Sequence, residues 1–479
     1  MYEVDHDDLR SPAYDTGSFR DRTSRVLHQD SRIIRVLDQQ AQSEWDLLRE
    51  QSFFLDGMKQ GKIVQTAEIT PVFSNINSIT DHPWVASLEH QAIPFISYPY
   101  EWSFGMLKKA ALLQLDLIRQ SLAVDMILKD STPYNIQWTG ATPVFIDIAS
   151  FVKLPAGTPW VGYRQFCELF MFPLMLQSYK GVPFQPWLRG SLEGIKAMEL
   201  SGLLSFRDLF RKGVLLHVVM QAKLQARHQS TNQNMQKTMK QAGFRKELIE
   251  HNVSALMRLV TSLYWDIKRS TWSNYVQEHN YSDHDLQGKK DFVEMVVSRS
   301  KYGLVWDIGC NTGVFSLIVA RHVGYVIAMD SDPLAIDRLF EVLERENNTR
   351  ILPLIANIAD PSPAIGWRNR ERKLLHQRGR PDLILALALI HHLVIAANIP
   401  MSECIDWLAE QSDELLIEFV DRGDTMVDKL LCNKQDIYSD YNRDSFENAL
   451  SKHYNIIEKK TLSSGLRTLY LAQKKPGPD

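Results

Sequence analysis

The feature that most constrains this chain is a regular alternation of short apolar segments and helix-like segments that begins at Leu304 and continues toward the C-terminus. Strands are expected at 304–308, 325–330, 350–357, 381–389 and 414–420. Such alternation predicts a parallel, doubly wound sheet, so this part of the chain is assigned to the α/β class with a Rossmann-like sheet. The final segment, 455–473, is expected to add a terminal β-hairpin. Ligands of such sheets bind at the carboxyl ends of the strands.

Two acidic residues and two glycines stand at the ends of the first two strands. The first strand runs into DIGCNTG, which contains Asp307, Gly309 and Gly313, and the second ends in VIAMD at Asp330. Glycine allows a tight turn and a close approach of the backbone to a ligand. A carboxylate at the end of the second strand is suited to the hydroxyl groups of a ribose. Because Asp307 would repel a pyrophosphate, the pattern favours a positively charged nucleoside over a dinucleotide.

Over about 289–475 the chain resembles the class I S-adenosylmethionine (SAM)-dependent methyltransferases. DIGCNTG is similar to their first motif and VIAMDSDP to their second. The resemblance implies SAM as the cofactor, with Asp330 at the ribose and the glycine turn at the methionine end. An NAD-binding Rossmann domain and an α/β domain that binds no ligand remain alternatives. The cofactor-binding residues that the resemblance implies are Asp307, Gly309, Cys310, Asn311, Gly313, Asp330, Asn357 and Ile358, where Asn357 replaces an acidic residue common in the family.

Two histidines, His391 and His392, follow the fourth strand of this sheet, in the sequence ALALIHHL. A histidine at that strand end can remove a proton from a hydroxyl or amine while the methyl group is transferred, because its pKa lies near neutrality. They are therefore the candidate catalytic residues. The alternative is that one packs and the other caps the next helix. The N/D-P-P-Y/F motif of enzymes that methylate nucleobase amines is absent here.

Three further features could contact a methyl acceptor. The segment 366–380 carries six basic residues against one acid and is expected to form a solvated helix or, alternatively, a patch for an anionic substrate or RNA. Glu418 ends the fifth strand and could orient the substrate. An aromatic lid over the cleft, or core of the connecting helices, could be formed by Trp272, Tyr275 and Tyr281.

The N-terminal half contains a second polar pattern in the run 128–150. Asp130 and Asn135 follow a long helix expected at 106–128, and Asp147 lies on a buried strand expected at 143–152. The pattern resembles the catalytic loop and metal-binding strand of protein-kinase-like folds. A histidine at the start of the loop, a glycine-rich loop and a strand lysine are missing. The alternative is that the side chains cap a turn.

These observations divide the chain into four parts. Residues 1–30 are a flexible lead-in, 31–220 an α+β domain with the kinase-like pattern, 221–288 a helical linker and lid, and 289–479 the methyltransferase domain. Further strands are expected at 61–69 and 92–100. Residues 163–220 are expected to be helical.

Composition excludes several classes of function. With 479 residues, a net charge of −3 and four scattered cysteines, the chain favours a multidomain protein of a reducing compartment without a metal site. No apolar run reaches the ~18 residues of a membrane helix, so a cytoplasmic protein without a membrane partner is expected.

The expected reaction is methyl transfer from SAM to an O, N or C atom of an unidentified acceptor, with a small molecule favoured. RNA methylation and a non-catalytic SAM-binding or pseudokinase scaffold are the alternatives. Over its whole length the chain also resembles nodulation-type methyltransferases with a long N-terminal domain. The pattern predicts neither the acceptor nor the oligomeric state.

Overall fold

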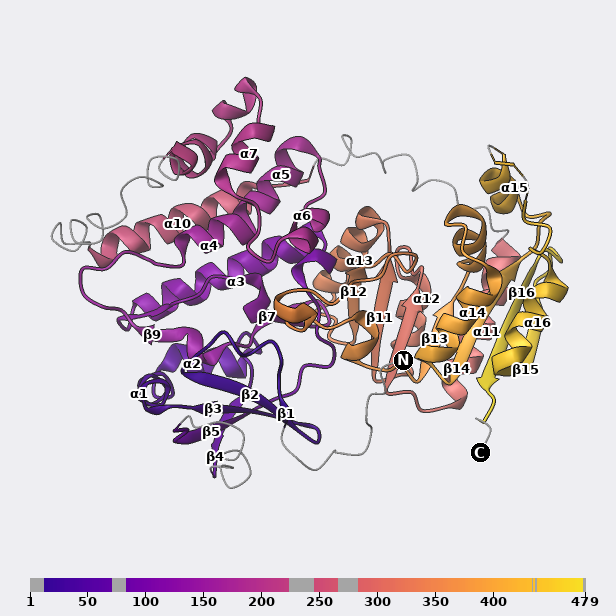
Figure 1. Ribbon diagram of the computed structural model, residues 1–479, viewed down its shortest axis with the longest axis horizontal. Coiled ribbons are helices and arrows are strands. Elements are labelled where there is room, and N and C mark those ends of the chain that lie inside the picture. Colours follow the sequence, from indigo (N-terminus) through magenta and orange to yellow (C-terminus); the bar gives the residue numbers. More distant parts are fainter. Residues whose placement is uncertain are drawn as a thin grey trace. The chain divides into compact units, whose positions relative to one another are not determined.

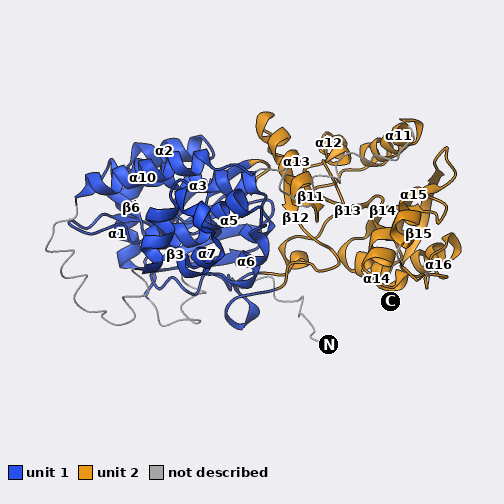
Figure 2. Cartoon of the chain, turned by 90° about the horizontal axis from the view of Figure 1, so that it is seen from above, with its two compact units in different colours: residues 1–138, 142–270, 364–372 blue, residues 139–141, 271–363, 373–479 orange. Residues whose placement is uncertain are grey.

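The computed structural model of the chain divides into two compact units, which Figure 2 colours separately. Unit 1 comprises residues 1–138, 142–270 and 364–372, and unit 2 comprises residues 139–141, 271–363 and 373–479. The residues that the structure describes are 13–70, 83–223, 245–265, 283–432, 434–435 and 437–476.

Unit 2 is built on a seven-stranded sheet in the order β12-β11-β10-β13-β14-β16-β15 (Figure 1). Its first five strands are parallel, and β16 pairs antiparallel with both β14 and β15. This order confirms the predicted α/β sheet and its terminal hairpin. The strands are β10 (Leu304–Ile308), β11 (Tyr325–Asp330), β12 (Ile351–Ile355), β13 (Leu383–Ala386), β14 (Glu414–Val420), β15 (Tyr454–Thr461) and β16 (Arg467–Lys474).

Three helices of unit 2, α13, α15 and α16, begin at a residue whose side chain caps the helix. In α13 (Pro333–Arg345), Asp332 accepts a hydrogen bond from the backbone N–H of Leu334, and a proline stands at the first helical position. Its buried residues recur at helical spacing and cover the sheet. The other helices are α11 (Asp283–Arg299), α12 (Val314–Val319), α14 (Met401–Gln411), α15 (Thr425–Leu431) and α16 (Arg443–His453).

Unit 1 begins with a five-stranded antiparallel sheet in the order β1-β2-β3-β5-β4. Two helices, α1 (Gln39–Leu48) and α2 (Ser52–Lys59), follow β3 in the chain. Leu27, Ile34, Val36 and Trp84 form a buried cluster in this part. The strands are β1 (Ala13–Tyr14), β2 (Ser24–Gln29), β3 (Arg32–Leu37), β4 (Thr66–Ile69) and β5 (Ala86–His90).

The rest of unit 1 is largely helical, so the unit has the predicted α+β character. Its central helix is α3 (Phe104–Leu122), which packs against α10 (Lys246–Ser262). Two short strand pairs, β6 with β9 and β7 with β8, follow α3. The remaining bounds are β6 (Met126–Leu128), β7 (Ile136–Thr139), β8 (Thr142–Phe145), β9 (Phe151–Lys153), α4 (Tyr163–Phe166), η5 (Cys167–Met171), α5 (Phe172–Lys180), α6 (Gln185–Gly190), α7 (Ala197–Leu203), η6 (Phe206–Phe210) and η7 (Val214–Val219).

Four local predictions were wrong. Residues 13–29, assigned to the lead-in, contain β1 and β2, because β2 pairs along its whole length with β3. The expected strand 92–100 lacks a ladder and ends in a short turn. The expected strand 143–152 is broken after Phe145, and the chain turns at Asp147. Helix α10, assigned to the linker, belongs to unit 1 because it packs on α3.

Candidate functional sites

The carboxyl ends of the parallel strands in unit 2 bring together the residues that the sequence singled out. In the ladder, Ile308 of β10 lies opposite Met329 of β11 and opposite Ala386 of β13, and Asp330 lies opposite Ile355 of β12. The predicted glycine turn, the strand-two acid and the two histidines therefore leave the same edge of the sheet. This is where ligands of doubly wound sheets bind.

The turn after β10 has a backbone that only glycine adopts without strain. Gly309 and Gly313 have φ of +77° and +79°. A Cβ on Gly309 would come no closer than 3.5 Å to a neighbouring side chain, Leu389, so space remains beside it. A Cβ on Gly313 would come within 2.5 Å of Leu339 on α13. Gly309 thus fits the predicted ligand approach, whereas Gly313 is already required by the close approach of Leu339.

Asp330 is held in place by two backbone donors. The N–H of Asn311 donates to Oδ2 at 2.8 Å, and the N–H of Asp332 donates to Oδ1 at 2.9 Å. Burial raises the pKa of this carboxyl, and these backbone hydrogen bonds oppose the rise. Each carboxylate oxygen has a further lone pair, so the group can still accept hydrogen bonds from a ligand's hydroxyls.

Asp307 is 1% exposed and receives a hydrogen bond of 2.5 Å from the hydroxyl of Ser316. Burial raises its pKa to about 6, against the opposing effects of Ser316 and of the charge on Lys289. Lys289, on α11, is also buried; its Nζ lies 2.6 Å from Glu418 Oε2 and 4.7 Å from the centre of the Phe315 ring. A buried carboxylate with this pKa near neutrality attracts a cationic ligand only when it is ionised.

Sequence reasoning missed Ser316 and Lys289. A signal for Lys289 was present, since it stands three, four and seven residues before buried positions of α11 and so lies on the helix face that packs inward. Because Lys289 stands beside other charged residues in the sequence KKDF, the pattern suggested a solvent-exposed lysine.

The other predicted cofactor residues differ in what they can offer. Cys310 is buried; its N–H donates to the carbonyl of Met329, its carbonyl accepts from Gly313, and burial raises the pKa of its thiol. Its polar backbone groups are therefore engaged within the turn. Asn311 and Asn357 are exposed, Asn357 lies just beyond β12, and its side chain accepts from the N–H of Ala359.

His391 is 1% exposed, and its Nδ1 has no hydrogen-bond partner within the described part of the chain. Burial, His392 and the charges of Arg467 and Lys289 hold the pKa of His391 well below its usual value. Burial also lowers the pKa of His392, whose ring centre lies 4.3 Å from that of His391. Both imidazoles are therefore neutral near pH 7 and can accept a hydrogen bond.

The backbone just before the histidines is strained. Ala388, between β13 and η12 (His392–Ala396), has a φ of +51°, a region that residues with a Cβ rarely adopt. Strain of this kind concentrates at functional sites.

Glu418 does not face a rim, as the sequence suggested. Its side chain is fully buried and pairs with Lys289 and, at 3.4 Å, with Arg467, which in turn binds Asp424 at 2.7 Å. This network joins α11, β14, β16 and the cap of α15, and Glu418 is engaged within it.

The basic segment 366–380 is not a helix. It contains two short turns, η10 (Trp367–Asn369) and η11 (Leu375–Arg378). Arg372 stacks over the ring of Tyr134 at 4.2 Å, Arg378 is buried, and Arg380 pairs with Asp413 at 2.6 Å. Arg372 and Arg378 thus serve internal contacts, whereas Arg368, Arg370 and Arg380 are exposed. Trp272, Tyr275 and Tyr281 lie outside the described residues.

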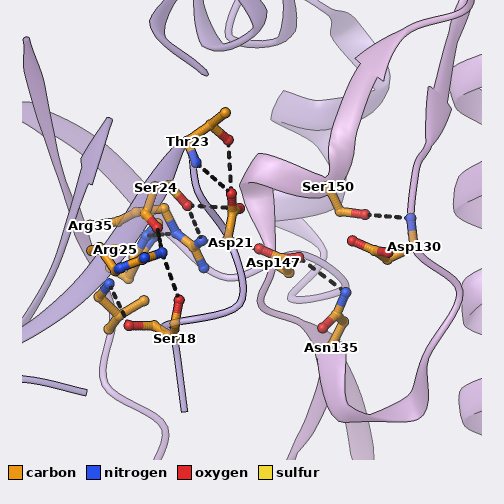
Figure 3. A network of polar contacts seen from close by, with 12 residues as sticks. Ser18, Asp21, Thr23, Ser24, Arg25, Arg35, Asp130, Asn135, Asp147 and Ser150 are labelled. Carbon is orange, nitrogen blue, oxygen red and sulfur yellow. Dashed lines mark hydrogen bonds and ion pairs between the residues drawn. The ribbon is translucent and has the colours of Figure 1, made fainter. Parts of the chain in front are cut away.

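Unit 1 brings the second set of predicted residues together (Figure 3). The Asn135 side chain donates to Asp147 Oδ2 at 3.1 Å, and Arg35 of β3 pairs with Asp147 Oδ1 at 3.1 Å. Burial and the charge of Asp147 raise the pKa of Asp130. Arg35, which sequence reasoning missed, therefore places a cation of the chain itself on Asp147.

Beside this cluster lies a small pocket of about 140 Å³. Its wall is largely apolar and includes Trp45 and Phe151, and its polar residues include Asp21 and Lys129, which lie 3.4 Å apart. Among the described residues, no cluster of His, Cys, Asp and Glu is arranged to hold a metal ion. Nor does any described helix have the length and apolar content needed to cross a membrane.

The chain is 33% identical over 465 residues to the nodulation protein NoeA of Rhizobium meliloti (strain 1021), a match that covers 97% of this chain and 96% of that protein. No model of a known protein family matches the chain. Among solved structures, the N-methyltransferase NodS of Bradyrhizobium japonicum WM9 matches with 15% identity, 41% of this chain, 99% of that chain and a TM-score of 0.31. The bifunctional kinase-methyltransferase WbdD matches with 15% identity, 43% of this chain, 46% of that chain and a TM-score of 0.31.

Proposed function

Because this chain belongs to the family of the nodulation protein NoeA, we propose that its C-terminal unit is a class I SAM-dependent methyltransferase domain and that it methylates an O, N or C atom of a small biosynthetic molecule. The observation that carries the proposal is the pair of aspartates at neighbouring strand ends, with the turn after β10 tied to Asp330 by the Asn311 N–H.

The residues at this edge fit SAM in charge and in shape. Asp330 offers lone pairs for two ribose hydroxyls, and Asp307 is an acid that suits a cationic ligand and not a pyrophosphate. Space beside Gly309 supports a close approach of the ligand to the backbone. Asn357 and Ile358, just beyond β12, are proposed to lie near the adenine, and Asn311 near the ribose.

SAM supplies an electrophilic methyl group on a sulfonium. The chain's task is to orient the acceptor for in-line attack and to exclude water, and positioning supplies much of the rate. We assign His391 to the acceptor's O–H or N–H, because its Nδ1 is buried and unpartnered. Its lowered pKa keeps it neutral and able to accept a hydrogen bond, but makes it a weak final base, so His391 is proposed mainly to orient the acceptor.

Unit 1 is proposed to recognise or present the acceptor. The convergence of Asn135 and Asp147, with Asp130 close enough to feel the charge of Asp147, supports a kinase-like ancestry. The Arg35–Asp147 ion pair argues against phosphoryl transfer, because a guanidinium occupies one oxygen of the carboxylate that would bind magnesium.

Two alternatives are less well supported. RNA methylation would need a continuous basic surface, whereas Arg372 stacks on Tyr134 and Arg378 is buried, which interrupts the basic segment. A non-catalytic scaffold would bind SAM and never release S-adenosylhomocysteine.

The decisive experiment is a SAM titration of the full chain by calorimetry, followed by assay of S-adenosylhomocysteine formation with small-molecule extracts from a strain that lacks the gene. We expect micromolar SAM binding and product formation with one acceptor fraction. Binding without product across all fractions would favour the scaffold, and product with RNA alone would favour the RNA enzyme.

His391→Ala and His392→Ala test the acceptor side of the site. Either change should lower turnover about 10- to 100-fold while SAM affinity stays within twofold, as expected for a group that acts on the acceptor. Wild-type turnover in both variants would remove the histidines from the mechanism.

A further inference from the structure

One face of unit 1 presents large apolar side chains to solvent. It is formed by α7, η6 and η7, and both α7 and η6 pack against η7. Phe206 and Phe210 are 76% and 77% exposed, and their rings touch edge to face with centres 5.6 Å apart. We call this set the phenylalanine face; its exposed members are Met198, Leu203, Phe206, Phe210, Leu215, Leu216 and Met220.

The loop that carries the two phenylalanines is anchored from beneath. Asp208, which lies between them in the chain, is buried and accepts hydrogen bonds from the backbone N–H and the hydroxyl of Ser205. It also pairs with Lys180 and Arg211, each at 3.0 Å. Arg211 in turn lies over the ring of Tyr179, at 4.9 Å from its centre. The phenylalanines are thus held outward by a fixed polar base and are not left exposed by a loose loop.

The exposed charges of this face are mostly positive, although α7 carries the exposed Glu199. Between 206 and 223 the only acidic residue in the sequence is Asp208, and it is buried within the base. Arg207, Lys212 and Lys223 are exposed on the same stretch. Exposed aromatic and aliphatic side chains flanked by cations form the pattern of a surface that inserts shallowly into a membrane interface and attracts anionic lipid headgroups.

We propose that the phenylalanine face docks unit 1 on an anionic lipid surface. Phe206 and Phe210 would enter the interface, and Arg207 and Lys212 would lie among the headgroups. Such docking needs no membrane-spanning helix, so the absence of a long apolar run, which led the sequence analysis to expect no membrane partner, does not bear on it. A second copy of the chain is a poorer occupant, because two faces of the same charge would oppose each other. The inference is independent of the methyl transfer proposed above.

The test uses the full-length chain and vesicles of phosphatidylcholine, with or without phosphatidylglycerol. We expect co-sedimentation with the anionic vesicles, at least tenfold weaker binding to neutral ones, and loss of binding as salt rises. The double variant Phe206→Ser/Phe210→Ser should bind anionic vesicles at least tenfold more weakly. Leu47→Ser, which changes an exposed leucine on α1, is the matched control and should bind as the wild type does.

A second variant protects the test against misfolding. Arg207→Ala/Lys212→Ala leaves the apolar residues in place and should also weaken binding to anionic vesicles several-fold, with an unchanged thermal midpoint and unchanged SAM affinity. Absence of vesicle binding by the wild type, or vesicle binding as strong as the wild type's in both double variants, would overturn the proposal. So would a wild-type dimer, measured by light scattering, that the phenylalanine variant converts to a monomer without any vesicle binding.

Discussion

Both units bring aspartates together at the ends of strands, but the groups that contact the carboxylates differ. In unit 2, the donors to Asp330 are backbone N–H groups and the donor to Asp307 is the Ser316 hydroxyl, so the negative charge stays available to a ligand. In unit 1, Asp147 is paired with the guanidinium of Arg35 and hydrogen-bonded to Asn135 (Figure 3). Similar residue types therefore produce an open site in one unit and a site closed by the protein's own cation in the other.

The largest expected effect is on stability, and it tests whether the unit 2 site depends on its buried network. Lys289→Met leaves Glu418 buried without one of its two cations and should lower the stability of the protein by about 3 kcal/mol. Chemical denaturation measures it. The neighbouring, less buried Lys290→Met is the matched control and should cost less than about 0.5 kcal/mol; equal losses in the two variants would show that the network is not what stabilises unit 2.

The next effect tests whether the open carboxylate binds the cofactor. Asp330→Ala should weaken SAM binding by about 2 kcal/mol, roughly 30-fold, because hydrogen bonds to a charged acceptor are lost. Calorimetry of the folded variant measures this. Glu341→Ala, on the exposed side of α13, removes a carboxylate of the same unit and should leave affinity unchanged. An Asp330 variant with wild-type affinity refutes the ribose assignment.

The pH dependence of the unit 2 site is a smaller effect with a defined sign. Asp307 has a pKa of about 6, so about one molecule in eleven is ionised at pH 5 and about ten in eleven at pH 7. If only the ionised form binds the cation, SAM affinity rises about tenfold from pH 5 to pH 7. Asp307→Asn should bind SAM weakly and without this dependence.

Stability should move in the opposite direction across the same range. The folded pKa of Asp307 lies above the value of 3.8 expected for the unfolded chain, so the folded state binds the proton more tightly and stability falls as pH rises from about 4 to about 6. Denaturation at several pH values, with Asp307→Asn as the control, separates this from other titrations. A wild-type affinity that is flat across pH 5–7 contradicts the role given to Asp307.

The smallest expected effect tests whether Arg35 prevents Asp147 of unit 1 from binding a metal ion. Arg35→Ala should destabilise the protein by about 1 kcal/mol, because Asp147 keeps the Asn135 hydrogen bond and some solvent contact. It should leave SAM affinity within twofold, and magnesium with ATP should raise the thermal midpoint of the variant but not of the wild type. An equal rise in the wild type would show that Arg35 does not block the site.

The strand-rich end of the chain was the more predictable half. All five parallel strands and the terminal hairpin formed where expected. Strands that are buried on both faces appear in the sequence as apolar runs, and the turn residues that end them stand next to them in the chain. In unit 1 the segment 92–100 has the β-branched and aromatic residues of a strand but no ladder. Propensity there was overridden by tertiary packing, which sequence pattern does not contain.

The sequence alone determined the doubly wound sheet, the positive-φ glycine turn and the two acids at neighbouring strand ends, since each depends on residue type and short spacing. Only the tertiary structure decided that Ser316 hydrogen-bonds to Asp307 and that the charge of Lys289 lowers its pKa, that Glu418 pairs with two cations, and that Arg35 pairs with Asp147 in unit 1. These pairs are separated by 9 to 129 residues in the chain. The energy of an ion pair depends on the distance between the charges in space, and the separation of two charged residues in the sequence does not give that distance.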